Sequence, residues 1–366
     1  MQKDNKILVL GASGLVGSAL LKKIMGKGYT NVIGTCHSKK KSSYPISLIQ
    51  IDLTNQSAVN SFFDKEKPEY VFLAAGKVGG IHANNTYKAD FIYENIMIAS
   101  NVIHAAYEFG VKKLLNLGSS CIYPKFAPQP LKEEYLLTSE LEPTNEPYAI
   151  AKISAIKLCR YFNEQYGTNF ISVMPTNLYG PNDNFDLLNS HVLPALLRKF
   201  HLAKLLSEEK YNDIIIDLEK YGNYNEIYSD DFNKIKENLE KFGIYSDRVK
   251  LWGSGSPFRE FLHVHDMADA CIFLMENMDY ADIGEFVNIG IGKDHTIKDI
   301  AELVRKSVGF RGSIDWDSSK PDGTPKKLLD VSRLNSLGWK ARIELNEGIK
   351  LFYDWYKKAD VVNKLF

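Results

Sequence analysis

Residues 6–17 read Lys6-Ile7-Leu8-Val9-Leu10-Gly11-Ala12-Ser13-Gly14-Leu15-Val16-Gly17, an apolar run followed by a loop with three glycines. The apolar run predicts a buried strand, and the spacing of Leu20, Leu21 and Ile24 predicts a helix after the loop. Glycines allow a tight turn and let the backbone approach a pyrophosphate, which then lies on the helix N-terminus. This stretch therefore predicts a strand–loop–helix unit that binds a dinucleotide.

Strand and helix patterns alternate beyond this unit. We expect strands at 31–36, 48–51, 70–75, 113–117 and 170–173, and helices at 57–66, 89–109, 146–166 and 192–201. Such alternation predicts an α/β fold with a Rossmann-type, doubly wound parallel sheet. We expect an NADP-binding domain at 1–180 and a smaller C-terminal α/β substrate lobe at 181–366, with short segments exchanged between them.

Residues 205–247 interrupt this rhythm. They are rich in Lys, Glu, Asp, Asn and Tyr, and Phe232, Ile235, Leu239 and Phe242 recur at helical spacing. We interpret the segment as a partly helical insertion in the second lobe rather than as a domain of its own.

Bulk composition excludes several classes of protein. Lys plus Arg equals Asp plus Glu at 45 each, so no overall charge favours nucleic acid or an anionic membrane. The four cysteines form no Cys-x-x-Cys pair, which argues against a disulfide framework and a structural metal site. Without a signal-peptide pattern or a long apolar run, we expect no membrane insertion and a cytoplasmic location.

The end of the second expected strand bears on the choice of cofactor. It reads Thr35-Cys36-His37-Ser38-Lys39-Lys40-Lys41, with cations where NAD sites usually carry an acid. This favours NADP, because the cations suit a 2′-phosphate; a solvated basic loop is the alternative. Asp52, after the third strand, is a candidate for contact with the adenine or for a helix N-cap.

Two further segments contain residues that could take part in catalysis. Tyr148 and Lys152 are four residues apart, hence on one face of a helix, and Ser119 follows a strand. We expect the ammonium to lower the phenol pKa and the hydroxyl to bond the same oxygen, as hydride transfer at a carbonyl requires. Cys121 and His191 can also titrate near neutrality. Each of these residues alone would more often be structural.

Several longer stretches of the sequence resemble a known family. Ser119, Tyr148 and Lys152 match the extended short-chain dehydrogenases/reductases, and the stretches closely resemble the GDP-L-fucose synthase family nearly end to end: Ala74–Ile81, Asn84–Tyr87, Asn145–Lys152, Met174–Pro181 and Lys320–Pro325. That family combines GDP-4-keto-6-deoxy-mannose 3,5-epimerase and 4-reductase activities in nucleotide-sugar biosynthesis, as for capsule or other polysaccharides. The resemblance implies an NADPH-dependent oxidoreductase that is also an isomerase.

The resemblance also implies roles for the catalytic residues. Cys121 and His191 would move protons at C3 and C5 of the sugar. Tyr148 would give a proton to the C4 oxygen while NADPH gives hydride to C4. Lys152 would hold the nicotinamide ribose, and Ser119 would position the carbonyl. Cys121 and His191 could also be kept for substrate positioning with epimerisation lost.

Binding residues follow from the same resemblance. Those implied for the cofactor are Gly11, Ser13, Gly14, Leu15, Val16, Gly17, His37, Lys39, Asp52, Leu53, Ala74, Ala75, Gly76, Tyr148, Lys152, Pro175, Asn177, Leu178 and His191. Those implied for the substrate are Lys77, Asn177, Val192, Lys199, Trp252, Arg259 and Asp322. Ser13 and Lys199 both stand where the family often has Arg. Trp252 could equally be an ordinary core residue.

The segment at 205–247 is an insertion relative to the family, in which a short loop connects the helix after His191 to the strand that contains Trp252. Long loops are usually functional or disordered, and we hypothesise a lid or an oligomer contact that alters which sugar is accepted. The alternative activity is C4 reduction of a GDP-4-keto-heptose without epimerisation. Two other classes fit the residues less well. An NAD-retaining dehydratase would have an acidic pair at the positions of Ser120 and Cys121. A non-catalytic NADP sensor would be free to lose Tyr148 or Lys152, and both are present. In the family that the chain resembles, helices such as those at 89–109 and 146–166 pair across a two-fold axis in a four-helix bundle, so the resemblance implies a homodimer.

Overall fold

The structure is a computed structural model and describes residues 1–38, 46–320 and 322–362. The chain divides into two units. The first unit contains Met1–Leu178, Glu260–Gly292 and Leu328–Ile343, and the second contains Tyr179–Arg259, Lys293–Lys327 and Glu344–Phe366. The chain therefore passes from one unit to the other at five places, which we call crossings: 178/179, 259/260, 292/293, 327/328 and 343/344.

A seven-stranded sheet with the order β10-β6-β5-β4-β1-β2-β3 forms the centre of the first unit. The strands are β1 (Ile7–Leu10), β2 (Val32–Cys36), β3 (Ile49–Gln50), β4 (Tyr70–Leu73), β5 (Lys113–Leu117), β6 (Phe170–Pro175) and β10 (Val287–Ile289). All six neighbouring pairs run parallel. The prediction of a doubly wound parallel sheet is confirmed, and β10 adds a seventh strand from a segment that returns late in the chain.

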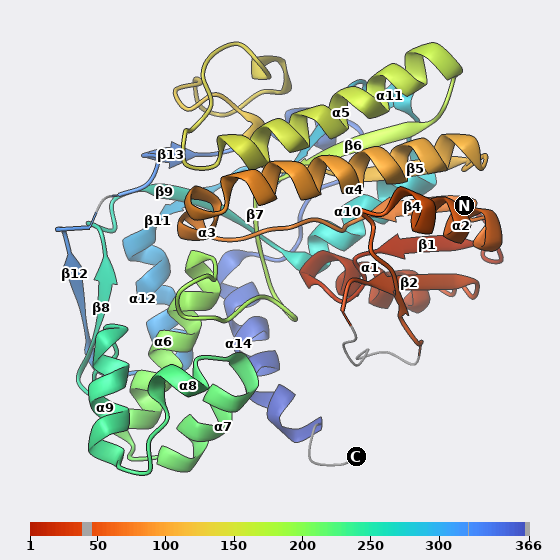
Figure 1. The fold of residues 1–366 in the computed structure, drawn as a ribbon. Helices are drawn as coiled ribbons and strands as arrows, with labels where there is room; N and C mark the ends of the chain where they lie inside the picture. Colours follow the sequence, from red (N-terminus) through yellow and green to blue (C-terminus); the bar gives the residue numbers. More distant parts are fainter. Residues whose placement is uncertain (39–45, 321, 363–366) are drawn as a thin grey trace. The chain divides into compact units, whose positions relative to one another are not determined.

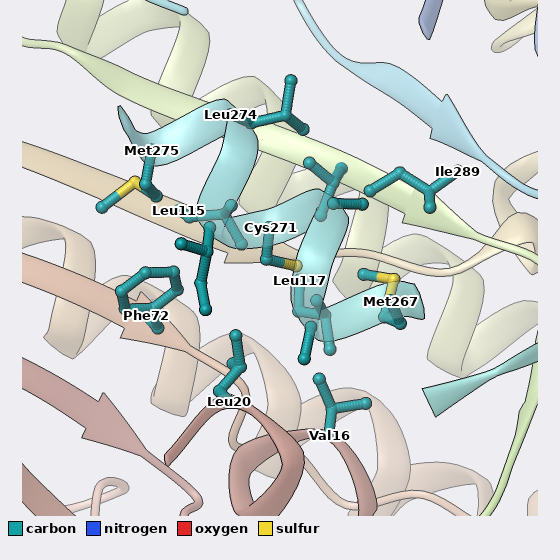
Figure 2. Close-up of a cluster of buried hydrophobic side chains, with 14 of the residues drawn as sticks. Val16, Leu20, Phe72, Leu115, Leu117, Met267, Cys271, Leu274, Met275 and Ile289 are labelled. Atoms are coloured by element: carbon teal, nitrogen blue, oxygen red, sulfur yellow. The ribbon is translucent and has the colours of Figure 1, made fainter. Parts of the chain in front are cut away.

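Alternating residues of β1 face two different cores. Ile7 and Val9 pack with α1 (Leu15–Gly26) and α10 (Val264–Asn277), and Figure 2 shows the α10 side chains beside residues of α1, β4 and β5. Leu8 and Leu10 pack on the other side with α2 (Gln56–Glu66), α4 (Lys88–Glu108) and α5 (Glu146–Tyr166). Helices thus cover both faces of the sheet (Figure 1). This burial on both faces explains why the strands are continuous apolar runs.

Most expected elements of the first unit lie within two residues of their observed bounds. Short elements complete the unit: α3 (Ile81–Thr86), α11 (Tyr280–Ile283), α13 (Ser332–Ser336) and the 3₁₀ turns η1 (Ser120–Ile122) and η2 (Glu133–Tyr135). No helix among the described residues combines the length and the apolar character that crossing a membrane requires.

Helices dominate the second unit. They are α6 (Val192–Ser207), α7 (Tyr211–Tyr221), α8 (Tyr224–Ile227), α9 (Phe232–Lys241), α12 (Ile297–Val308) and α14 (Leu345–Val362). Strand β8 (Arg248–Trp252) pairs in parallel with β12 (Ser313–Asp317). A further small sheet has the order β11-β9-β13, with β7 paired to β9, and its strands are β7 (Asn177–Tyr179), β9 (Phe258–His263), β11 (Asp294–Thr296) and β13 (Lys326–Lys327).

The insertion at 205–247 is helical, as its apolar spacing predicted. It contains the end of α6 together with α7, α8 and α9 (Figure 1). Ile214, Leu218, Ile227, Ile235 and Leu239 are fully buried. The insertion therefore has an apolar interior and is an integral part of the second unit.

A buried arginine ties the insertion to α6. Arg198 is fully buried, and its Nε donates to Asp217 Oδ1 of α7 at 2.8 Å. Its Nη1 donates to the carbonyls of Phe185 and Tyr221 and to Asn223 Oδ1, and Nη2 donates to the carbonyl of Gly222. The other Asp217 oxygen accepts from the Tyr356 hydroxyl of α14. The guanidinium thus has partners on every nitrogen, which offsets the cost of burying its charge.

Candidate active site

The glycine loop packs the start of α1 closely against the sheet. Gly11 has a φ of +80°, and a Cβ placed there would lie 2.8 Å from the Ala75 nitrogen. A Cβ on Gly17 would lie 2.1 Å from the Gly11 oxygen. Within the described chain, α1 has Gly14 as its N-cap with no capping side chain, and its first turn contains no acidic residue. This loop therefore suits a phosphate, because nothing anionic stands at the positive end of the helix.

The region after β2 and β3 is described in part. His37 and Ser38 are exposed at the end of β2, whereas Lys39, Lys40 and Lys41 lie outside the described residues. Asp52 Oδ1 accepts from the Thr54 nitrogen at 2.9 Å and hydroxyl at 2.7 Å, and these bonds lower the Asp52 pKa. The N-cap of α2 is Asn55, so the alternative that Asp52 caps this helix is wrong. Its contact with adenine stays a prediction.

Lys152 lies at the carboxyl ends of β4 and β5. Its Nζ donates to the Leu117 carbonyl at 2.8 Å. A Cβ placed on Gly76 would lie 3.6 Å from that Nζ and 2.9 Å from Asn95 Oδ1. Ala75 in turn touches the glycine loop through Gly11. The glycine loop and Lys152 are therefore neighbours within one unit, at the strand ends where open α/β sheets bind their ligands.

Ser119 and Tyr148 meet at the same place. The Ser119 side chain hydrogen-bonds Tyr148, and its Oγ accepts from the Cys121 nitrogen at 3.4 Å. Lys152 Nζ lies 5.6 Å from the centroid of the Tyr148 ring. The structure thus brings together Ser119, Tyr148 and Lys152.

The expected direction of the Tyr148 pKa shift is wrong for this structure. Burial raises the Tyr148 pKa, the charge of Cys121 raises it further, and the Ser119 hydrogen bond opposes the rise. Burial lowers the Lys152 pKa to about 8. Desolvation is the largest cause of both shifts, because both groups lie in the same water-poor site.

Cys121 lies beside these groups. It lies in η1 as a thiol outside any disulfide, is 7% exposed, and is close enough to Tyr148 and Lys152 to shift the pKa of both. His191, its implied partner, belongs to the second unit, where it is the N-cap residue of α6. Desolvation and the charge of Lys327 lower the His191 pKa, which favours the neutral imidazole.

Two polar residues that the sequence analysis did not single out shape the site. Asn95 is buried on α4, where its Oδ1 accepts from the Lys77 nitrogen at 3.0 Å and its Nδ2 donates to the Lys77 carbonyl at 3.0 Å. Glu260 is the other, since its carbonyl accepts from Asn177 Nδ2 at 2.9 Å. Neither residue is isolated in its element, because Glu94 precedes Asn95 and Arg259 precedes Glu260, so the sequence offered no local signal for either.

The remaining cofactor candidates of the first unit line the same strand ends. Leu53 is buried, Pro175 ends β6, and Leu178 packs against the core shared by α1 and α10. The predicted substrate residue Lys77 has its Nζ 2.6 Å from Glu94 Oε1, and this hydrogen bond raises the Lys77 pKa.

The other substrate candidates belong to the second unit. Val192 is exposed at the start of α6, and burial lowers the pKa of Lys199 on the same helix to about 8. Trp252 is 68% exposed at the end of β8, so its interpretation as a core residue is wrong. Burial lowers the Arg259 pKa while Asp322 opposes the shift.

Asp322 organises the loop after Trp252. Its Oδ1 accepts from the Ser254 nitrogen at 2.9 Å, and its Oδ2 accepts from the Ser254 hydroxyl at 2.7 Å. A Cβ on Gly253, where φ is +80°, would lie 2.4 Å from the same carboxylate. The loop thus presents the indole face of Trp252. Arg259, on β9, adds a partly desolvated guanidinium cation.

Comparisons with known proteins identify the family to which this chain belongs. The model of the NAD dependent epimerase/dehydratase family matches residues 7–232 and 219–290. GDP-L-fucose synthase 1 of Arabidopsis thaliana is 52% identical over 97% of this chain and 94% of its own length.

Two solved structures from Campylobacter jejuni are also similar. One is a GDP-6-OMe-4-keto-L-xylo-heptose reductase, with a TM-score of 0.89, 44% identity, and coverage of 98% of this chain and 99% of the other. The other is MlghC, a GDP-mannoheptose C4 reductase with NADP bound, with a TM-score of 0.84, 44% identity and the same coverage. The chain therefore belongs to the NAD dependent epimerase/dehydratase family and, within it, to the GDP-L-fucose synthase family.

Proposed function

We propose that this chain is an NADPH-dependent reductase of the C4 ketone of a GDP-4-keto sugar of the GDP-4-keto-6-deoxy-mannose type. Reduction is coupled to epimerisation at C3 and C5 and gives GDP-L-fucose or a related GDP-sugar. The observation that carries this proposal is the meeting of Ser119, Tyr148 and Lys152 at the strand ends that also hold the glycine loop.

NADP(H) fits the first unit. The close approach of Gly11 and Gly17 leaves backbone at the N-terminus of α1, where the pyrophosphate would lie. The bound nicotinamide supplies the hydride. Lys152 would hold its ribose, and the cations after β2 would hold the 2′-phosphate.

Tyr148 supplies the proton. Because burial raises its pKa, the phenol is protonated at neutral pH and can donate to the C4 oxygen as negative charge develops there. The Ser119 hydroxyl bonds the phenol and positions the carbonyl, and the Lys152 ammonium stabilises the phenolate left behind.

Epimerisation needs an acid and a base on opposite faces of the sugar, because each inversion removes a proton on one side and returns one on the other. The C4 ketone acidifies the hydrogens at C3 and C5. We assign this exchange to Cys121 and His191: the thiol stands beside the reductive residues, and the lowered pKa of His191 keeps its imidazole able to accept a proton.

Arg259, Lys199 and Trp252 would bind the GDP portion. The guanidinium of Arg259 can hold two phosphate oxygens at once, and its partial burial strengthens such a bond. Lys199 offers a point charge instead of a fork. The exposed indole of Trp252 can stack on the base or the sugar.

The second candidate is C4 reduction of a GDP-4-keto-heptose without epimerisation. Its support is the likeness to the two C. jejuni reductases, each of which aligns with 98% of this chain. The two candidates share the reductive residues and differ in whether Cys121 and His191 exchange protons with the sugar.

One experiment separates them. The purified chain is given GDP-4-keto-6-deoxy-mannose or a GDP-4-keto-heptose with NADPH in deuterated water. Loss of NADPH reports reduction, and deuterium at C3 or C5 of the product reports epimerisation. A Cys121→Ser variant controls for exchange that the enzyme does not catalyse. Absence of NADPH loss with either sugar would overturn the proposed reductase.

The assembly is a homodimer in this proposal. Helices α4 and α5 pack against each other and carry exposed aromatic side chains, among them Tyr93 and Tyr161. Pairing of these helices across a two-fold axis would cover the aromatic side chains in a four-helix bundle.

The cellular location is proposed from the cysteines, and the use of the product from the chemistry of GDP-sugars. All four cysteines are buried and none forms a disulfide, as is usual in reducing compartments, and this supports a cytoplasmic location. A GDP-sugar is an activated glycosyl donor, so the product would serve synthesis of a capsule or another polysaccharide.

A further inference from the structure

A single carboxylate, Glu260, lies where the chain repeatedly leaves and re-enters the first unit. Glu260 is fully buried and is the first residue after the 259/260 crossing. A buried carboxylate is costly unless it is hydrogen-bonded on both oxygens. The partners that Glu260 uses are therefore informative.

The side chain binds two other crossings. Oε1 accepts from the nitrogens of Ile291 and Gly292, each at 2.7 Å, at the 292/293 crossing. Oε2 accepts from the Leu329 nitrogen at 3.0 Å, one residue beyond the 327/328 crossing. The carboxylate thus receives backbone N–H groups from two segments that are far apart in the sequence.

The main chain of Glu260 binds a further crossing. Its carbonyl accepts from the Thr176 hydroxyl at 3.2 Å and from Asn177 Nδ2 at 2.9 Å, just before the 178/179 crossing. Four of the five crossings, at 178/179, 259/260, 292/293 and 327/328, are therefore joined through one residue.

Local packing fits this carboxylate closely. A Cβ placed on Gly290 would lie 2.3 Å from Glu260 Oε1, so the backbone must be bare there for the oxygen to reach Ile291 and Gly292. The fifth crossing, 343/344, is held in a similar manner. Asp266 Oδ2 accepts from the nitrogens of Arg342 at 2.9 Å and Ile343 at 2.8 Å, and Asp266 is buried in the first turn of α10.

We infer that Glu260 is a positioning residue that fixes the first-unit ends of four crossings and thereby the placement of Asn177 and Arg259, the implied binding residues beside it. This inference rests on the proposed function for its kinetic readout only. Asn177 bonds the Glu260 carbonyl directly, and Arg259 directly precedes Glu260 in the chain. Asp266 performs the same task at 343/344.

The test is Glu260→Gln with Glu133→Gln as its matched control. The amide keeps one oxygen for Ile291 and Gly292 but turns an N–H₂ group toward the Leu329 nitrogen, which leaves donor against donor. Glu133 is also buried, and its Oε1 accepts from the Asn288 nitrogen at 3.0 Å, but it bonds no residue flanking a crossing. Both variants replace a buried carboxylate oxygen with an amide nitrogen. Only Glu260→Gln weakens a hydrogen bond beside a crossing.

We expect Glu260→Gln to raise the KM for the GDP-sugar and to lower kcat/KM by about tenfold to a hundredfold, because small misplacements of reacting groups are costly. Binding of NADPH to the first unit is expected to change little in either variant. Glu133→Gln is expected to keep the kinetic constants, because its remaining oxygen can still accept from the Asn288 nitrogen. Equal kinetic losses in the two variants, or unchanged kinetics in Glu260→Gln, would overturn the inference.

A second readout needs no substrate. Hydrogen exchange on the free protein should become faster at 328–330 in Glu260→Gln, where the amide faces the Leu329 nitrogen, and at both 291–293 and 328–330 in Glu260→Ala, which removes both acceptors; Glu133→Gln should change neither segment. If no GDP-4-keto sugar is turned over, the proposed function fails while this exchange pattern still decides the positioning role. In Glu260→Ala, faster exchange confined to 328–330 would contradict a shared anchor.

Discussion

Burial and hydrogen bonding act on the Tyr148 phenol in opposite directions. Burial raises its pKa, whereas the Ser119 hydroxyl favours the phenolate. The resting residue is therefore an acid, which suits proton donation to a reduced carbonyl. Substrate and cofactor therefore bind to a site in which the Tyr148 phenol is already protonated.

Replacing Tyr148 with Phe removes that proton and leaves the ring. We expect kcat for NADPH oxidation to fall about 10²–10⁴-fold, the usual contribution of a positioned general acid. Binding of NADPH should persist, because the glycine loop is unchanged. Tyr161→Phe on the same helix, 53% exposed, is the control and should match the wild type. Full activity of Tyr148→Phe would exclude this tyrosine as the acid.

Lys152 gives the reaction its expected pH dependence. Burial lowers its pKa to about 8, so the cation that stabilises the phenolate is present below that pH and is lost above it. The kcat for reduction, measured at saturating NADPH, should fall as pH rises through about 8.

Lys199 has the same lowered pKa of about 8 and could produce a similar fall. A Lys199→Arg variant keeps a charge at that position over the whole range. The falling limb should therefore survive in Lys199→Arg, and its disappearance there would assign the limb to substrate binding instead.

At the residue scale, the geometry could be predicted where it depends on a local sequence pattern. The glycine loop and the Tyr148–Lys152 pair each depend on a few neighbouring residues, and the structure joins them as expected. The direction of the Tyr148 shift and the exposure of Trp252 were not predictable, because burial depends on distant segments. The roles of Cys121 and His191 stay predictions.

At the scale of elements, α6 is longer than its sequence pattern indicated. We expected residues 192–201, and the helix runs Val192–Ser207 with Leu205 and Leu206 buried. The polar composition that follows obscured the end of the helix. Packing against the insertion, which one helix's sequence does not reveal, sustains the last turns.

Arg198 is the strongest link between α6 and the insertion. Arg198→Met would leave Asp217 buried without its cation, and we expect a loss of about 3–5 kcal/mol in the free energy of unfolding. Urea denaturation measures this loss. Arg160→Met removes the exposed pair with Glu164 on α5 and should cost about 1 kcal/mol or less. Similar losses in both variants would show that the buried network contributes little.

The effect of the insertion on sugar choice stays a prediction of its own. Its helices are part of the packed second unit, so removing the whole segment would expose Ile214, Leu218 and Leu239. Surface substitutions on α9 are the better probe, because they leave these buried residues in place.

At the scale of the whole molecule, the sheet could be predicted but its last strand could not. Strands β1 to β6 follow one another in a regular rhythm, and β10 joins β6 from a segment more than a hundred residues later. The anchors of the crossings, Glu260 and Asp266, escape sequence analysis for the same reason. Their partners come from segments with no local pattern in common.

A homodimer is the expected assembly. Tyr93 on α4 is 64% exposed and Tyr161 on α5 is 53% exposed. Sedimentation should give a dimer for the wild type, and Tyr93→Arg with Tyr161→Arg should shift it toward monomer. Phe126→Arg, at a site 82% exposed and outside both helices, is the control. A monomeric wild type would contradict the four-helix bundle.

The loop that carries Trp252 has an optical consequence. Trp252 is strongly exposed, whereas Trp339 is 4% exposed and its Nε1 donates to Asp269. Trp252 should therefore contribute red-shifted fluorescence that GDP quenches by stacking, above a background from Trp316, Trp339 and Trp355. A Trp252→Phe variant should lose most of the quenching, and quenching that survives at its full extent would place the nucleotide elsewhere. Nucleotide occupancy could then be followed in real time without any label, through light that the protein emits itself.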